Sequence, residues 1–168
     1  MPNMQLPRVA DMNVIYKIRE IMENNGFTSG KYQVVDGFPN ESKLERGMIW
    51  PTIAVEIQLV FGKDVELGSE QWPALQISID VLAKTDSQRD DIAYLIWRTM
   101  NEEIYTFYDF NSGFPVAVGN YAGITTNGDW SLDNMTITNL TPPNKTTVDG
   151  LQHHAFIDGL LHLPNINL

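Results

Sequence analysis

Two stretches of the chain alternate apolar and polar side chains with a period of two, and a short connection joins them. The apolar positions are Ile53, Val55, Ile57, Leu59 and Phe61 in the first stretch and Leu75, Ile77, Ile79 and Val81 in the second. A period of two places these side chains on one face of a strand. The pair predicts an antiparallel hairpin with one dry face, which needs a cover.

Helical periodicity on both sides of this hairpin supplies that cover. Residues 11–25 carry apolar side chains at helical spacing, and Gly26 offers a left-handed cap. After the hairpin, Thr85 and Gln88 stand at capping-box spacing before a second amphipathic helix with apolar Ile92, Ile96 and Met100. This order predicts an α+β fold, in which an antiparallel β-sheet carries two helices packed on one face.

The remaining segments are expected to extend this single domain, which spans residues 1–168. Residues 32–35 suit a short strand, and alternation over residues 155–163 predicts a late strand that returns to the sheet. Residues 109–150 are interpreted as an extended β-hairpin or loop excursion, with Asn127-Gly128 as a hairpin turn. Aromatic residues in this excursion favour ordering on a partner; they are Phe114, Tyr121 and Trp130.

Composition excludes several classes of function. The net charge of −10 works against gripping DNA or docking on an anionic membrane, because both need a positive face. Cysteine is absent, which rules out thiolate and iron–sulfur chemistry. The first residues lack the pattern of a signal peptide, so we expect synthesis and assembly in the cytoplasm.

Three histidines raise the alternative of a metal-dependent hydrolase. They are His153, His154 and His162, with Asp158 nearby. On one strand, however, each step of four residues covers about 13 Å, too far for one ion. Exposed histidines on the polar face of an edge strand explain the same residues.

The hairpin connection, residues 64–72 with the sequence DVELGSEQW, has no pattern of a catalytic or phosphate-binding loop. Gly68-Ser69 leads toward a strand and lacks the following helix and lysine that a phosphate loop needs. The carboxylate pairs Asp90-Asp91 and Glu102-Glu103 are expected on a solvated helix face. We therefore expect no catalytic, cofactor-binding or metal-ligating residues, no cofactor and no enzymatic activity.

With these elements assembled, residues 51–104 resemble the tail-terminator and neck (head–tail joining) proteins of tailed bacteriophages. The likeness lies in the proline-opened strand at Pro51–Val55, the Glu-Leu-Gly loop at residues 66–68, the Ile-Asp-Val-x-Ala-Lys run at 79–84 and the polar helix start at 87–91. The resemblance implies a structural virion protein that forms a ring, commonly of six copies, capping the tail tube and meeting the head-side connector. The long segment 109–150 departs from the smallest members, which leaves terminator, connector and stopper open.

The expected partners follow from this resemblance. They are further copies of the chain in a homohexameric ring, the tail tube protein, the head-side connector, and DNA that passes through the lumen without specific binding. The expected interface comprises Glu66, Leu67, Gly68, Ser69, Trp72, Tyr121 and Trp130. A monomeric module that binds a small molecule or glycan through Tyr121 and Trp130 is a further alternative.

The loop likeness generates a first prediction. Glu66→Lys should disturb ring formation at a protein concentration where circular dichroism still reports a normal fold. Sedimentation velocity measures the assembly; if the variant assembles like the wild type, the loop is a plain connection between strands.

Overall fold

A computed structural model describes residues 6–39, 48–60, 74–140 and 153–163. In these residues the elements follow the order α1 (Leu6–Asn24), β1 (Gln33–Asp36), β2 (Thr52–Val60), β3 (Ala74–Ala83), α3 (Asp86–Met100), β4 (Ile104–Tyr108), β5 (Thr126–Leu140) and β6 (His153–His162). Within these ranges, neither helix combines the length and apolar character needed to cross a membrane.

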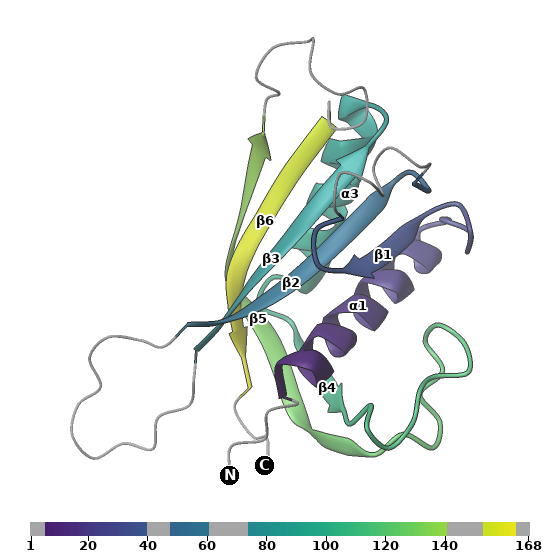
Figure 1. Cartoon of the computed structure of the whole chain (residues 1–168), viewed down its shortest axis with the longest axis vertical. Helices are drawn as coiled ribbons and strands as arrows, with labels where there is room; N and C mark the ends of the chain where they lie inside the picture. The colour runs from purple at the N-terminus through teal and green to yellow at the C-terminus, as the bar shows by residue number, and fades with distance from the viewer. Residues whose placement is uncertain (1–5, 40–47, 61–73, 141–152, 164–168) are drawn as a thin grey trace, which may run out of the picture.

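The strands form one sheet in the order β1-β2-β3-β6-β5-β4, which curls as a half-barrel around the helices (Figure 1). The expected α+β class is confirmed. The sheet is not wholly antiparallel, because β1 runs parallel to β2. Residues 37–51 separate the two strands in the sequence, and a parallel pair needs a connection long enough to return to the same end of the sheet.

The predicted hairpin and its cover are both present. Ile53 pairs with Val81 and Val55 with Ile79 in the antiparallel β2–β3 ladder, so their side chains share one face. That face forms a single buried core with apolar residues of both helices, including Ile18 of α1 and Ile96 of α3. The two helices therefore lie on the same side of the sheet.

Both helix caps inferred from the sequence are observed. Gly26 adopts φ +87°, and the following Phe27 N–H donates to Met22 O at 3.0 Å, which closes the end of α1. The Thr85 hydroxyl accepts from Gln88 N–H at 3.2 Å at the start of α3. The observed α1 begins at Leu6, before the expected start at Asp11.

Residues 126–140 correct the interpretation of segment 109–150. They form β5, which lies between β4 and β6 in the sheet. Asn127-Gly128 is not a hairpin turn: it lies where the β4–β5 register shifts between Thr106 and Tyr108. Gly128 has φ +78°, and a bulge uses the same left-handed conformation as the turn that this dipeptide suggested. The hairpin in this region is β4–β5, and residues 109–125 connect its strands.

The late strand is present as β6. The interpretation of the histidines assumed an edge strand, but β6 is an interior strand of the sheet. β6 pairs with β3 on one side and with β5 on the other. Ala155 and Ile157 are fully buried on its core face. The strand therefore joins the first hairpin to the second, which makes it central to the sheet.

Helix α1 holds both edges of the curled sheet. At the β4 edge, Asn13 Nδ2 donates to Tyr108 O and Asn13 Oδ1 accepts from Tyr108 N–H, both at 2.9 Å. At the β1 edge, Arg19 Nη2 donates to Val34 O at 3.2 Å. Asn13 is only 4% exposed and also donates to Val9 O of its own helix. The Asn13 amide thus bonds to both the N–H and the C=O of Tyr108, as the backbone of a neighbouring strand would.

These bonds generate a second prediction. Asn13→Ala should lower the free energy of unfolding by about 2–3 kcal/mol, because it leaves the Tyr108 N–H without its partner and removes one of the two donors to Tyr108 O, the other being the Phe110 N–H. Chemical denaturation measures the loss. Asn25→Ala is the control, since Asn25 is exposed and its amide makes one local bond to Ile21 O. Equal effects of the two substitutions would contradict this role of Asn13.

Candidate functional site

Residues 109–125, here called the arm, leave the end of β4 and project beyond α1 (Figure 1). The arm is closed at its base by the Asp109 N–H, which donates to Thr125 O at 2.8 Å. Ser112 fastens the same base, because its hydroxyl donates to Asp109 O at 2.7 Å and accepts from Thr125 N–H at 3.0 Å. These bonds make the arm an ordered loop whose ends are pinned together.

Aromatic stacking and one hydrogen bond hold the arm against α1. The rings of Tyr108 and Tyr121 stack with centroids 4.2 Å apart and planes 13° apart. The Tyr121 hydroxyl donates to Glu20 Oε2 at 3.4 Å. Tyr16 of α1 contacts Phe110, and Phe110 in turn stacks on Phe114. A chain of rings therefore runs from the helix to the outer part of the arm.

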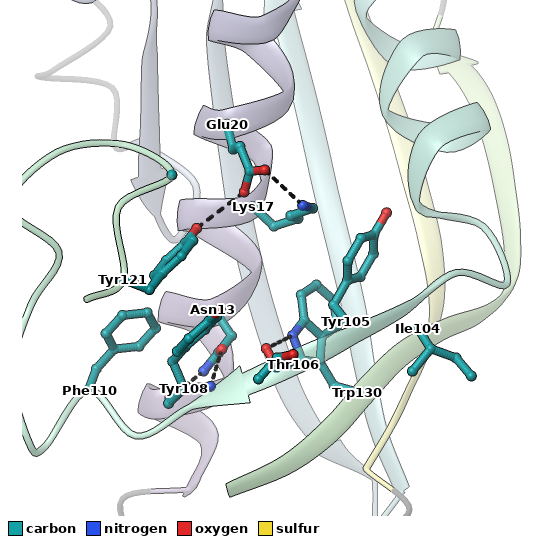
Figure 2. A pocket seen from close by; sticks show the side chains of 11 residues that line it. Asn13, Lys17, Glu20, Ile104, Tyr105, Thr106, Tyr108, Phe110, Tyr121 and Trp130 are labelled. Atoms are coloured by element: carbon teal, nitrogen blue, oxygen red, sulfur yellow. Dashed lines mark hydrogen bonds and ion pairs between the residues drawn. The ribbon is translucent and has the colours of Figure 1, made fainter. Parts of the chain in front are cut away.

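Between the arm, α1 and β4 lies a pocket of about 360 Å³, here called the aromatic pocket. Its lining residues are Asn13, Lys17, Glu20, Ile104, Tyr105, Thr106, Tyr108, Phe110, Gly119, Tyr121 and Trp130. Figure 2 shows Tyr121 and Phe110 on the arm side and Tyr105 and Ile104 on the β4 side. Aromatic walls with a few polar groups suit an apolar or planar guest.

The charged groups of the aromatic pocket neutralise each other. Lys17 Nζ lies 3.1 Å from Glu20 Oε1 and 4.6 Å from the centroid of the Tyr105 ring. Burial, together with the Glu103 and Glu20 carboxylates, raises the pKa of Tyr105 to about 12. Burial and Glu20 likewise raise the pKa of Tyr121. Both phenols thus stay protonated at neutral pH. Their O–H groups already donate, from Tyr105 to Thr99 O at 2.6 Å and from Tyr121 to Glu20, so the two residues offer a guest their rings.

Apolar side chains are exposed on the arm and at the pocket. Phe114 is 59% exposed and Val116 86% exposed, both on the arm, and Ile104 of β4 is 72% exposed. After Asp109, the arm lies in a stretch, residues 110–128, that contains no charged residue and no histidine, although the whole chain carries a net charge of −10. This part of the molecule therefore presents an uncharged, partly apolar surface on an acidic background.

The residues expected at the interface divide into three groups. Glu66, Leu67, Gly68, Ser69 and Trp72 lie outside the described residues. Tyr121 lines the aromatic pocket. Trp130 is only 2% exposed and its indole N–H donates to Thr106 O at 3.2 Å, so it packs inside the fold and offers a partner little surface.

Two of the histidines are neighbours on β6 but have different partners. His153 pairs with Asp86 of α3, whereas His154 pairs with Asp80 of β3 beside the Phe38 ring. Successive side chains of a strand point to opposite faces, which explains why these neighbours have different partners. In the part of the chain that the structure describes, no group of three or more His, Cys, Asp or Glu side chains could hold a metal ion.

A partly buried carboxylate, that of Asp11, lies where α1 meets β1 and β2. Asp11 Oδ1 is buried, and it has no hydrogen-bond partner among the described residues. Burial raises the pKa of Asp11 to about 7, helped by the Asp36 and Glu56 carboxylates and opposed by a hydrogen bond from the Ile57 backbone. Asp11 therefore makes the stability of the α1–β1–β2 region dependent on pH.

Sequence reasoning did not identify most of the residues that build the aromatic pocket. Asn13, Lys17 and Glu20 of α1 stand far along the chain from Tyr105 of β4, and only folding brings them together. The uncharged stretch 110–128 was a visible signal for the arm.

Comparisons with known proteins assign no family. No protein-family model matches the chain, and no curated protein does. Two solved structures of pyrrolysyl-tRNA synthetase from Desulfitobacterium hafniense show a distant likeness. One is 12% identical, with a TM-score of 0.39 over 90% of this chain and 66% of that one. The other, PylSc, is 14% identical, with a TM-score of 0.33 over 71% of this chain and 41% of that one. The chain thus spans less than two thirds of either structure, and TM-scores below 0.5 support no argument about activity.

The buried carboxylate generates a third prediction. Because the folded pKa of Asp11 lies above its ordinary value of 3.8, the stability that the protonated carboxyl contributes is present below about pH 4 and lost as pH rises through about 7. Asp11→Asn should therefore raise the free energy of unfolding at pH 8 by about 1 kcal/mol, allowing for partial solvent screening. Denaturation at pH 5 and pH 8 measures this.

Asp91→Asn is the control, since it removes the same charge from an exposed position of α3. An identical pH dependence in Asp11→Asn and wild type would contradict the assignment.

Proposed function

We propose that the chain is a structural virion protein of a tailed phage, a ring-forming tail terminator at the head–tail junction. In this role, copies of the chain close into a ring, expected to be a hexamer, that caps the tail tube and meets the connector. The residue patterns over 51–104 support the proposal. Another neck position, connector or stopper, would use the same assembly properties.

The observation that carries the proposal is the arm. Copies with a charge of −10 repel one another, so association is favoured where charge is absent and apolar surface can be buried. The arm meets both conditions, because it carries no charge beyond Asp109 at its base and exposes Phe114 and Val116. Its base is fastened by hydrogen bonds, so little conformational entropy is lost on binding.

The acidic remainder of the chain is consistent with the same role. A channel through which DNA slides must not hold the phosphate backbone, and negative charge prevents that. Exposed carboxylates such as Asp91, Glu102 and Glu103 belong to this background. A ring with these properties lets DNA pass through its channel without specific binding.

The arm generates a fourth prediction. Val116→Asp places a charge on the surface proposed to be buried, so the concentration for half-assembly should rise at least about tenfold. Gln76→Glu is the matched control, because it adds one negative charge at an exposed position of β3. Sedimentation velocity and negative-stain imaging measure ring formation.

Two outcomes count against the proposal. If Val116→Asp forms rings as readily as the wild type, the arm is not part of the interface. A wild-type chain that stays monomeric at high concentration, together with tails of normal length made in its absence, would remove the terminator function.

A further inference from the structure

The aromatic pocket and the exposed end of the arm are complementary surfaces of the same chain. We propose that the arm tip, residues 113–116, of one copy inserts into the aromatic pocket of the next copy. This inference rests on the proposed function, since it names the two surfaces through which the ring subunits would meet.

The chemistry of the two surfaces supports this pairing. The pocket is walled by aromatic rings, and its two charged side chains, Lys17 and Glu20, already pair with each other. A charged guest would have to break that pair or remain unpaired in a partly buried site, which is costly. The arm tip carries no charge and offers a phenyl ring and a branched aliphatic side chain, so it enters without that cost.

The size of the pocket also suits this guest. A cavity of about 150 Å³ holds a benzene molecule. The aromatic pocket measures about 360 Å³, which leaves room for the Phe114 ring and the Val116 side chain. Aromatic rings in such a site gain from edge or offset stacking beyond their buried area. An inserted phenylalanine would therefore serve as the central anchor of a larger contact.

The tip does not fill the pocket of its own chain. Phe114 stacks on Phe110, with ring centroids 6.4 Å apart and planes 11° apart, and Phe110 forms part of the pocket wall. Phe114 itself is not a lining residue and remains 59% exposed. Phe110 thus lies between the tip and the pocket of the same chain.

Insertion of the tip into another copy joins two unlike surfaces. Such a contact is heterologous, so each copy keeps one free tip and one free pocket until the assembly closes. Ile104 is 72% exposed on the β4 side of the pocket, where it would flank the incoming tip. Val116 of one copy and Ile104 of the next are therefore expected to be neighbours.

Cross-linking tests this inference, helped by the absence of cysteine from the chain. Val116→Cys and Ile104→Cys proteins are mixed under assembly conditions and treated with a short bismaleimide. We expect a covalent dimer in the mixture at a yield at least about tenfold above that of either variant alone. The doubly substituted chain should give a ladder of bands whose largest member reports the number of copies in the ring.

A mixture of Val116→Cys and Tyr94→Cys is the matched control, because Tyr94 is an exposed aromatic residue of α3 outside the pocket. Equal yields with Tyr94→Cys and Ile104→Cys would overturn the inference. Dominant dimers of Val116→Cys with itself would also overturn it, in favour of a symmetric contact between arms. Wild-type rings with no cross-link to Ile104→Cys would overturn the inference alone, whereas monomers throughout would overturn the proposed function as well.

Discussion

The hydrogen bonds between the Asn13 amide and the Tyr108 backbone join α1 to the β4 edge of the sheet, and the arm and the aromatic pocket depend on this junction. They fix the end of β4 to α1 and therefore fix where the arm begins, since Asp109 follows directly. The Tyr108 ring, placed by the same bonds, stacks on Tyr121 and becomes a wall of the aromatic pocket. A side chain that offers one donor and one acceptor in the plane of a peptide group can replace a neighbouring strand at one residue.

The curl of the sheet explains why this replacement of a strand by a side chain is important. An open sheet has two edges whose free backbone groups can pair with other chains. In this fold α1 reaches both edges, through Asn13 at β4 and through Arg19 at β1. Backbone groups at these two points are already bonded, which disfavours strand addition there. Association through side chains of the arm, as proposed, agrees better with this arrangement than edge-to-edge pairing.

Charge distribution separates the surfaces that repel other copies from the surface that can meet one. Acidic side chains are spread over the chain, yet residues 110–128 carry none. Charge is also neutralised inside the aromatic pocket, where Lys17 pairs with Glu20 and lies over the Tyr105 ring. The proposed ring thus combines an uncharged contact with an acidic background, and the two properties come from different segments of one chain.

The amino-acid sequence by itself determined the elements whose signals are local. Period-two alternation, helical periodicity and capping residues predicted the β2–β3 hairpin, both helices and their caps, because each depends on residues close together in the chain. Only the tertiary structure decided the parallel β1–β2 pair, the central position of β6, the bulge at Asn127-Gly128 and the burial of Trp130. Each depends on which distant segment lies alongside, and the left-handed glycine of a bulge looks the same in sequence as that of a turn. Asn13 and Tyr108 stand 95 positions apart, so nothing local indicates that a polar residue of α1 completes the last strand and shapes the pocket beside it.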